Sequence, residues 1–533
     1  MFLDRIPLTP SGKTDRSALP TPSPGHASSP ETETECALAS IWAEVLGGSE
    51  VGRESNFFDL GGNSLAAARL AVHIQQHFGK QVPARLIYDH PVLMQAARVI
   101  AEGMCEKDNP AGDARRKSMD SDAQLEASLT PAAFQNASPD GAVFLTGASG
   151  YLGIFLLHEL VRTSERPVLC LVRAASADAG WQRICEQLAY YGLPEAKIKS
   201  RLTMIPGDLA RERFGLSQSA FARLAHQTQA ILHAGANVHF YHPYEVLAPT
   251  NVEGTREVLR LACYTGRREV HYVSTLAVAD THGTSGTHVL ESFQPTSDDP
   301  PLTGYAQSKW VGERLLWQAQ RRGLPVSCYR CDDIAGQSRT GQGNPRDFLW
   351  QWVRACVAMQ CAPDVDMPLY MIPVDVVAKA IVCCMTQGLA RNETLHLHNP
   401  QPTSWQRLLD ALSICGHAVQ RIPLADWLLL AEQRLAAGDS LVSGIAGVLL
   451  DRVPGTEVSL LESALAGRRA TYDDHHAVRA LQSGCMQISA VDTAMLERYC
   501  RAALEQGPHP TRVSPVAYWT SERMMCRLQP KVA

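Results

Sequence analysis

Tyr305 and Lys309 are the two side chains of this sequence whose spacing most directly suggests chemistry. They lie four residues apart in GYAQSKW, at the start of an amphipathic segment, so a helix would place them on one face. A lysine ammonium beside a phenol favours the phenolate, so the pKa of Tyr305 is predicted to fall towards neutral pH. Thr275 follows Ser274 at the end of a strand-like run, REVHYVST, and could hold a substrate oxygen beside Tyr305. The Tyr-x-x-x-Lys spacing alone is weak, because it matches many surface helices, and its meaning depends on the surrounding elements.

A glycine-rich turn lies upstream of this pair. An apolar run at 143–145 leads into TGASGYLG, and an apolar helical pattern continues through Val161. A strand, a glycine turn and a helix in this order are typical of a dinucleotide site, where phosphates bind the free N–H groups of the helix N-terminus. Gly147 would allow the tight turn, Gly150 the approach of the pyrophosphate, and Gly153 close packing of helix and strand. The positions expected to contact the cofactor here are Gly147, Ser149, Gly150, Tyr151, Leu152 and Gly153.

The second strand-like run, PVLCLV, ends at Arg173 rather than at an acid. An acid in this place would bind a free ribose 2′-hydroxyl, whereas a cation favours a 2′-phosphate. Arg173, with Arg183 on the following helix, therefore predicts NADPH rather than NADH. The ends of later strands complete the expected cofactor site, with the adenine near the third strand and the nicotinamide near the fourth. These positions are Asp208, Leu209, Ala234 and Asn237, and Lys309 would also hold the nicotinamide ribose.

The order of strand-like and helix-like segments predicts the architecture. From residue 139 onward they alternate, which is typical of a Rossmann-type, doubly wound parallel sheet, with a nucleotide-binding core at about 139–375. From about 376 to 533 the pattern becomes mainly helical and predicts a smaller C-terminal lobe. Residues 35–104 carry apolar residues at helical spacing and predict a small all-α domain. The polar residues 105–138 predict a linker with a short helix near 122–128.

Ser64 stands at a predicted helix start in DLGGNSL, directly after two glycines and an asparagine. On these residues alone Ser64 could be only a helix N-cap. The whole segment, from its first helix through NFFDLGGNS to YDHP, resembles a peptidyl or acyl carrier domain of four helices. The resemblance implies that a phosphopantetheinyl transferase attaches 4′-phosphopantetheine to Ser64, and that the arm carries an acyl or peptidyl thioester.

The motifs TGASGYLG, LVRA, PGDL, NVEGT, YVST and GYAQSKW together resemble the extended short-chain dehydrogenase/reductase family. In detail they are similar to the thioester reductase domains of nonribosomal peptide synthetases and carboxylic acid reductases. The resemblance implies an NADPH-dependent reductase with Thr275, Tyr305 and Lys309 as catalytic residues and a C-terminal lobe that closes the substrate cleft and meets the carrier. One departure is Cys331-Asp332, where the family usually has Pro-Gly; this leaves the substrate preference open.

Residues 1–34 contain PSGKTDR, which resembles the closing loop of an adenylation domain. In that family the lysine, here Lys13, serves adenylation. The rest of such a domain is absent from this sequence, so we interpret Lys13 as an exposed loop lysine. The resemblance implies upstream synthetase domains, for adenylation and condensation, as partners.

Composition excludes several other classes. The 533 residues are 45% hydrophobic with a net charge of −5 and no basic block, which predicts a globular protein without a nucleic-acid partner. No apolar run reaches the roughly 20 residues of a membrane span, and the N-terminus does not resemble a signal peptide. The 15 scattered cysteines predict reduced thiols, and we expect a cytoplasmic monomer. No metal is expected, because the following residues lack a ligand-like spacing: His396, His398, Asp473, Asp474, His475 and His476.

These patterns predict reductive release of the carrier-bound thioester as an aldehyde; whether a second reduction yields a primary alcohol stays open, as does the acyl chain. A Dieckmann-type cyclisation without a redox step is the main alternative. Domains of that kind tend to lack the catalytic tyrosine, so Tyr305 argues against it. A docking module whose nucleotide fold is purely structural is a further alternative, and the complete set of catalytic residues argues against it. A sugar-nucleotide epimerase is another, and the fused carrier domain argues against that.

Overall fold

The structure is a computed structural model, and it divides the chain into two compact units. One unit comprises residues 1–110 and 428–463, and the other comprises 111–427 and 464–533. The adenylation-like segment lies outside the described residues up to position 27, and so does Lys13. The described residues are 28–62, 64–79, 86–102, 117–131, 141–195, 198–239, 242–264, 266, 268–281, 284, 286–443, 445 and 470–505.

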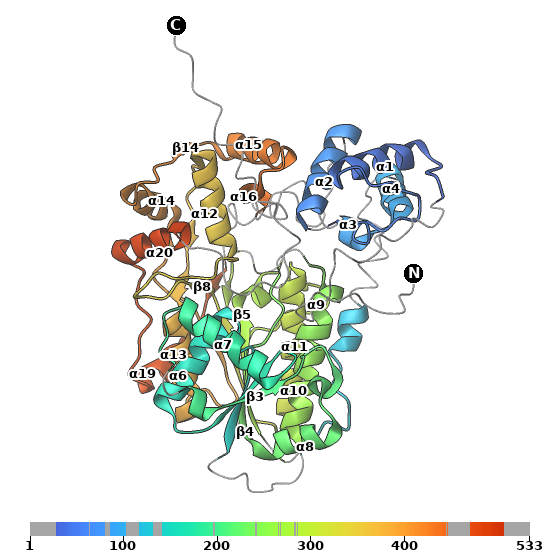
Figure 1. Ribbon diagram of the computed structural model, residues 1–533. Helices are drawn as coiled ribbons and strands as arrows, with labels where there is room; N and C mark the ends of the chain where they lie inside the picture. Colours follow the sequence, from blue (N-terminus) through green and yellow to red (C-terminus); the bar gives the residue numbers. More distant parts are fainter. Residues whose placement is uncertain are drawn as a thin grey trace. The chain divides into compact units, whose positions relative to one another are not determined.

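The first unit contains the four helices expected of a carrier domain (Figure 1). They are α1 (Glu33–Val45), α2 (Ser64–Phe78), α3 (Leu86–Asp89) and α4 (Leu93–Glu102). The hydroxyl of Thr32 accepts a hydrogen bond from Glu35 N and caps α1. Trp42 and Phe57 are fully buried and meet edge to face, with ring centroids 5.1 Å apart. Residues 428–463, which the sequence placed in the C-terminal lobe, also belong to this unit, where α16 (Ser440–Ser443) contacts α2.

The second unit is built on a seven-stranded sheet whose neighbouring strands all pair in parallel. The strand order is β12-β7-β5-β4-β1-β2-β3, so the order reverses beside β1, as it does in a doubly wound fold. The predicted fold class is therefore confirmed. The strands are β1 (Ala142–Thr146), β2 (Val168–Val172), β3 (Leu202–Pro206), β4 (Thr228–His233), β5 (Glu269–Thr275), β7 (Val326–Cys331) and β12 (Thr394–Leu397).

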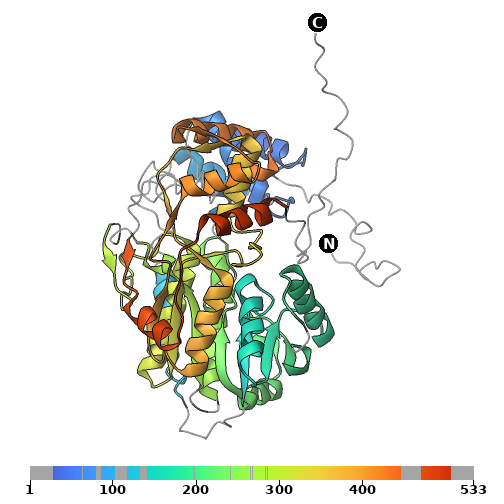
Figure 2. The same cartoon turned by 90° about the vertical axis from the view of Figure 1, so that its left-hand side faces the viewer.

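Helices cover both faces of this sheet, as Figures 1 and 2 show. Successive side chains of a strand point to opposite faces, so Val143 and Leu145 of β1 enter one core and Phe144 the other. Both faces are apolar for this reason. The first core packs against α6 (Tyr151–Thr163), α13 (Val374–Gln387) and α19 (His475–Ser483). The second packs against α8 (Gln218–Gln227), α10 (Glu253–Tyr264) and α11 (Gly304–Arg321), while α7 (Ala177–Tyr190) lies against β3 and α9 (Tyr244–Asn251) against α11.

Outside the main sheet the second unit is mainly helical, but this part does not have the predicted bounds of 376–533, because β12 within that range belongs to the main sheet and one of the helices begins at Phe348. Trp352 and Trp405 stack with ring centroids 4.3 Å apart, and both are buried. The helices here are α12 (Phe348–Met359), α14 (Trp405–Ile414), α20 (Thr493–Glu505) and the start of α15 (Leu424–Ala436). Short strand pairs are β8 (Asp333–Ala335) with β11 (Met371–Pro373), β9 (Cys361–Pro363) with β14 (Gln420–Ile422), β10 (Pro368–Leu369) with β13 (Thr403–Ser404), and β6 (His288–Val289) with β15 (Thr471–Tyr472).

Residues 117–131 correct the linker prediction for 105–138. They form a helix at 117–122, earlier than the predicted 122–128, followed by turns and irregular backbone. Met119, Ala123, Leu125 and Leu129 are buried in the core shared with α10 and α11. The pattern was misread because these four apolar residues are spread among charged ones, and their partners lie more than 100 residues away. No helix of the described residues combines the length and the apolar character needed to cross a bilayer.

Candidate active site

The glycine turn between β1 and α6 has the close contacts that its sequence predicted. Gly147 has φ of +79°, and a Cβ there would lie 2.7 Å from the backbone of Gly235. A Cβ on Gly153 would lie 1.8 Å from the carbonyl oxygen of Gly147, so helix and turn can pack this closely only at a glycine. Gly150 is the N-cap of α6 and offers no side chain to the first-turn N–H groups. These N–H groups suit a phosphate.

A buried hydrogen-bonded chain fixes the carboxyl ends of β1 and β4 beside this turn. Thr146 Oγ1 accepts from Gly235 N at 3.0 Å and lies 2.7 Å from His233 Nδ1. Thr255 donates its hydroxyl to Asn251 O at 2.6 Å, so it accepts from His233 Nε2 at 3.1 Å. His233 is therefore a neutral imidazole protonated at Nε2, and burial with the nearby Lys309 lowers its pKa to about 3. The sequence analysis missed His233.

Arg173 and Arg183 lie together at the end of β2. Arg183 Nη1 donates to the carbonyl oxygen of Arg173 at 3.2 Å, and Arg183 Nε is buried without a hydrogen-bond partner. Burial lowers the pKa of Arg183, and the charges of Arg173 and Arg346 lower it further. The carboxylate of Glu186 acts in the opposite direction on Arg183, and the remaining excess of positive charge around Arg183 suits a bound anion. Arg346 was not predicted, since it reaches this cluster from a loop more than 160 residues away.

The remaining predicted cofactor positions lie along the same edge of the sheet. Leu209 meets Gly235, where a Cβ would lie 2.6 Å from Leu209 Cδ1, and Asp208 Oδ1 accepts from the N–H of Ala210. Ala234 directly follows β4, and its carbonyl carbon lies against Gly147. The backbone of Asn237 is held by Asn251, which we had not predicted.

Asn251 connects the β4 loop to the helix that carries Tyr305. Its Oδ1 accepts from Asn237 N at 2.7 Å, and its Nδ2 donates to Asn237 O at 3.0 Å. The same Nδ2 donates to Ser308 Oγ at 2.9 Å, and Ser308 in turn donates to Tyr305 O. The only signal for this residue was its place in the motif NVEGT.

Tyr305 and Lys309 lie in the first turns of α11, which Thr303 caps by accepting from Ala306 N. Lys309 is 3% exposed, and its Nζ lies 3.8 Å from the centroid of the Tyr272 ring. Burial lowers the pKa of Lys309 to about 8. Thr275 ends β5, and its Oγ1 accepts from Ala277 N at 3.2 Å. The Thr275 hydroxyl can therefore still donate a hydrogen bond to a substrate oxygen.

The protein's own groups do not lower the Tyr305 pKa; the predicted lowering also counted the positive ring of an oxidised cofactor. Burial raises the pKa of Tyr305, and Cys331, which pairs with Thr275 across β5 and β7, adds to the shift. Loss of hydration of the phenolate is the larger of these two causes. Tyr305 is therefore a neutral phenol at neutral pH. A neutral phenol can donate a proton, which is the role that a reduction requires.

A buried ion pair lies behind these residues. Arg330 Nη2 donates to Glu313 Oε2 at 2.7 Å, and the two side chains are 1% and 2% exposed. Ser274, next to Thr275, donates to Glu313 Oε1 at 2.5 Å. Glu313 follows Lys309 by one helical turn and raises the pKa of that lysine. The same carboxylate accepts from the neighbour of Thr275, so it acts near two of the three predicted catalytic residues. Its only signal in the sequence was its spacing in SKWVGE.

Two of the histidines considered as metal ligands, His396 and His476, have other hydrogen-bond partners. His396 accepts from Arg330 at Nε2 and donates from Nδ1 to Asp473 O at 2.8 Å. Burial and the Arg330 charge lower its pKa to about 3. His476 and its neighbour Ala477 donate backbone N–H groups to the buried Glu291. Within the described parts of the chain, no three His, Cys, Asp or Glu side chains come together as a metal site.

Ser64 is the first residue of α2, as predicted, and its side chain lies outside the described residues. Gly61 has φ of +93°, and a Cβ on Gly62 would lie 2.4 Å from the ring of Phe57. Gly61 is thus required by its positive φ, and Gly62 is required because a side chain there would collide with Phe57. The phosphopantetheine role of Ser64 stays a prediction.

Two family profiles match the chain. The one described as phosphopantetheine attachment site covers residues 36–100, and the NAD-binding one described as male sterility protein covers 145–381. The chain is 34% identical over 464 residues to the isonitrile lipopeptide synthase of Streptomyces coeruleorubidus, and 32% identical over 540 residues to the nonribosomal peptide synthetase asaC of Aspergillus flavus. These matches cover 82% and 95% of this chain, but only 31% and 52% of those proteins.

Solved structures extend the comparison. The terminal R domain from the myxalamid PKS-NRPS biosynthetic pathway is 33% identical, with a TM-score of 0.66, over 74% of this chain and 98% of that one. A thiolation-reductase di-domain from an archaeal nonribosomal peptide synthetase has the same fold, with a TM-score of 0.70 at 20% identity, over 90% of this chain and 99% of that one.

Fold and site thus define a carrier domain with a phosphopantetheine attachment site, followed by an NAD-binding domain of the short-chain dehydrogenase/reductase type. The chain belongs to the family of carrier and reductase domains of nonribosomal peptide synthetases. The reductase domain makes it a nicotinamide-dependent oxidoreductase.

Proposed function

We propose that this chain releases an acyl or peptidyl group from its own carrier by NADPH-dependent reduction. The substrate is the thioester on the phosphopantetheine arm of Ser64, and the products are an aldehyde and the free thiol of the arm. A second round in the same site would convert the aldehyde to a primary alcohol. The observation that carries the proposal is the position of Tyr305, Lys309 and Thr275 at the carboxyl edge of the sheet where the glycine turn also ends.

The residues present fit a dinucleotide with a 2′-phosphate. The uncapped N-terminus of α6 and the glycines of the turn accommodate a pyrophosphate. Arg173, Arg183 and Arg346 form a cationic cluster beside the end of β2, and an anion there would relieve their mutual repulsion. We therefore propose NADPH rather than NADH. When bound, the cofactor supplies the hydride.

The chain's own residues would then control the substrate oxygen. Thr275 would donate its hydroxyl hydrogen to that oxygen, and the neutral Tyr305 would donate a proton to it as negative charge develops. Lys309 would place a positive charge beside the phenol and hold the nicotinamide ribose. Collapse of the resulting hemithioacetal breaks the carbon–sulfur bond and returns a proton to the thiol.

The decisive experiment loads Ser64 with an acyl-phosphopantetheine, adds NADPH, and follows cofactor oxidation together with the mass of the released product. One NADPH per aldehyde, or two per alcohol, is expected. Release without cofactor oxidation would instead support the non-redox cyclisation or hydrolysis, and the roles given to Tyr305 and Thr275 would be wrong.

The carrier domain implies partners. We propose that a phosphopantetheinyl transferase modifies Ser64 and that upstream adenylation and condensation domains supply the acyl group. The cytoplasmic location and the monomeric state remain predictions from the sequence.

A further inference from the structure

Residues 117–131, here called the strap, are anchored to the reductase by apolar packing, hydrogen bonds and ion pairs. Met119, Ala123, Leu125 and Leu129 are between 0% and 7% exposed and pack with α10 and α11. The sequence placed these side chains in a linker, where they would be exposed to solvent. Their burial shows that this part of the chain is folded onto the second unit.

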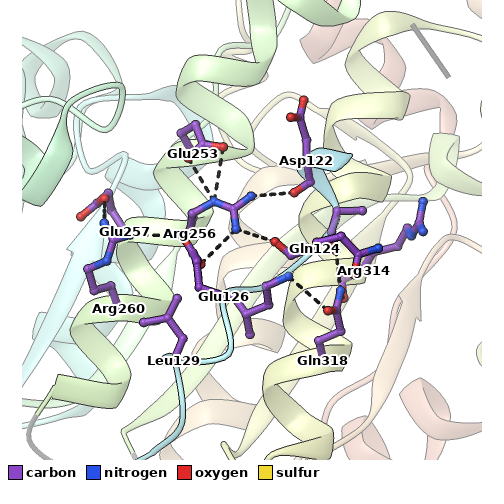
Figure 3. A network of polar contacts seen from close by, with 12 residues as sticks. Asp122, Gln124, Glu126, Leu129, Glu253, Arg256, Glu257, Arg260, Arg314 and Gln318 are labelled. Atoms are coloured by element: carbon purple, nitrogen blue, oxygen red, sulfur yellow. Dashed lines mark hydrogen bonds and ion pairs between the residues drawn. The ribbon is translucent and has the colours of Figure 1, made fainter. Parts of the chain in front are cut away.

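Arg256 of α10 binds the strap backbone directly (Figure 3). Its Nη2 donates to Asp122 O and its Nη1 to Gln124 O, both at 2.7 Å. The side chain is 9% exposed and also pairs with Glu126 at 3.1 Å and with Glu253 of its own helix at 3.0 Å. Burial by itself would lower the pKa of Arg256, but Glu253 and Glu126 raise it above the usual value, so the cation is well satisfied here.

The helix that carries Tyr305 binds the other side of the strap. Gln318 accepts from Leu125 N at 3.1 Å, and its amide donates to Ala123 O. Arg322, the C-cap of α11, donates to the carbonyl oxygens of Leu125 at 2.9 Å and of Leu129 at 3.0 Å. Most of these bonds go to the strap backbone, so they hold its path rather than single side chains.

Two carboxylates complete the anchor at the start of the strap. Asp120 pairs with Arg314 of α11 at 2.7 Å and accepts from Ser297 at 2.5 Å, and these hydrogen bonds lower its pKa. Asp122 accepts from the hydroxyl of Tyr244 on α9 at 2.7 Å. The strap is thus bonded to three helices of the reductase.

We infer that the strap fixes the covalent tether of the carrier to the reductase, so that the residues between α4 and the strap set the length of that tether. This inference rests on the proposed delivery of the thioester by the attached carrier. Lys117 follows Glu102, the last residue of α4, by 15 positions, which can span at most about 54 Å. Without the anchor, the 39 positions to Gly141 could span about 140 Å. The anchor therefore raises the effective concentration of the carrier at the active site.

Two matched insertions test the inference. A 20-residue Gly-Ser segment is inserted either before the strap, within 103–116, or after it, within 132–140. The acyl-loaded protein then reacts with NADPH in the presence of isotope-labelled soluble acyl pantetheine, and the label in the product gives the share contributed by the attached carrier. We expect the upstream insertion to lower the ratio of unlabelled to labelled product by about 3.5-fold, from the −3/2 power dependence on a tether of 15 positions lengthened to about 35, and the downstream insertion to leave this ratio unchanged. Equal effects of the two insertions, including none, would overturn the inference.

A release variant and a second readout make the result independent of the proposed function. Arg256→Met, Gln318→Leu and Arg322→Met together remove the hydrogen bonds that α10 and α11 make to the strap backbone, so the downstream insertion should now lower the ratio as well. Hydrogen exchange reports the anchor without catalysis: we expect the Leu125 amide to be protected in the wild-type protein and exposed in this variant. Rapid exchange of the Leu125 amide in the wild-type protein would overturn the inference that the strap is anchored. Absence of any reduced product from the soluble thioester would contradict the proposed function alone.

Discussion

Replacing Glu313 by Gln should destabilise the reductase and alter the titration of Lys309. Glu313 and Arg330 are 2% and 1% exposed, and the carboxylate receives three contacts of 2.7 to 3.2 Å from the guanidinium. The variant leaves Arg330 buried without its hydrogen-bonded carboxylate, and Glu291 is the remaining negative charge that acts on it. Breaking a buried pair in this way costs about 3–5 kcal/mol, because the remaining charge stays desolvated.

The catalytic consequence is separate from the loss of stability. Burial lowers the pKa of Lys309 to about 8, while Cys328 and Glu313 act in the opposite direction. Without the Glu313 carboxylate the pKa of Lys309 should fall further. If protonated Lys309 is the active form, the loss of activity at alkaline pH will begin at a lower pH in the variant.

The assay combines urea unfolding, followed by hydrogen exchange of the β5 and β7 amides, with a pH–rate profile on a soluble acyl thioester. The matched control is Asp410→Asn, because Asp410 pairs with Arg421 at the surface, where such pairs contribute about 0–1 kcal/mol. Adding Arg330→Met to Glu313→Gln should restore much of the stability but not the pH profile. A loss of stability below about 1 kcal/mol, or no recovery in the double variant, would refute the reasoning.

Four further outcomes are expected. Tyr305→Phe should abolish reduction while NADPH binding, measured by fluorescence titration, stays largely intact; normal turnover would contradict the mechanism. Ser64→Ala should block pantetheinylation, detected by mass, but spare reduction of a soluble acyl thioester. Arg183→Ala should weaken NADPH binding at least tenfold and NADH binding little, and equal losses would contradict the 2′-phosphate role. The folded-state pKa of Lys309, about 8, lies below its usual 10.5, so between these pH values the unfolded chain binds more protons than the folded one. The contribution of Lys309 to the free energy of unfolding should therefore rise by about 3 kcal/mol from pH 8 to 10.5. In Lys309→Met this rise should be absent from pH-dependent unfolding curves.

Much of the fold could be predicted because its signals are local. The alternation of apolar runs and helical patterns predicted the parallel sheet, and the spacing of Gly147, Gly150 and Gly153 predicted a turn whose contacts the structure contains. A strand's apolar run and a glycine's lack of Cβ act on neighbouring residues, so one sequence is enough to read them. The strap was misread as a linker, since its burial depends on Arg256 and Arg322, which are distant in the sequence.

The sequence by itself determined the fold class and the type of nucleotide turn, and it named Tyr305, Lys309 and Thr275 as candidate catalytic residues. Only the tertiary structure decided the protonation of Tyr305, because the cost of burying a phenolate depends on everything that surrounds it. The same holds for Glu313, which connects Ser274 and Arg330, and for Arg346 beside Arg183. Charge and hydrogen bonding act through space, so residues far apart in the chain set the chemistry of a site whose members the sequence had already named.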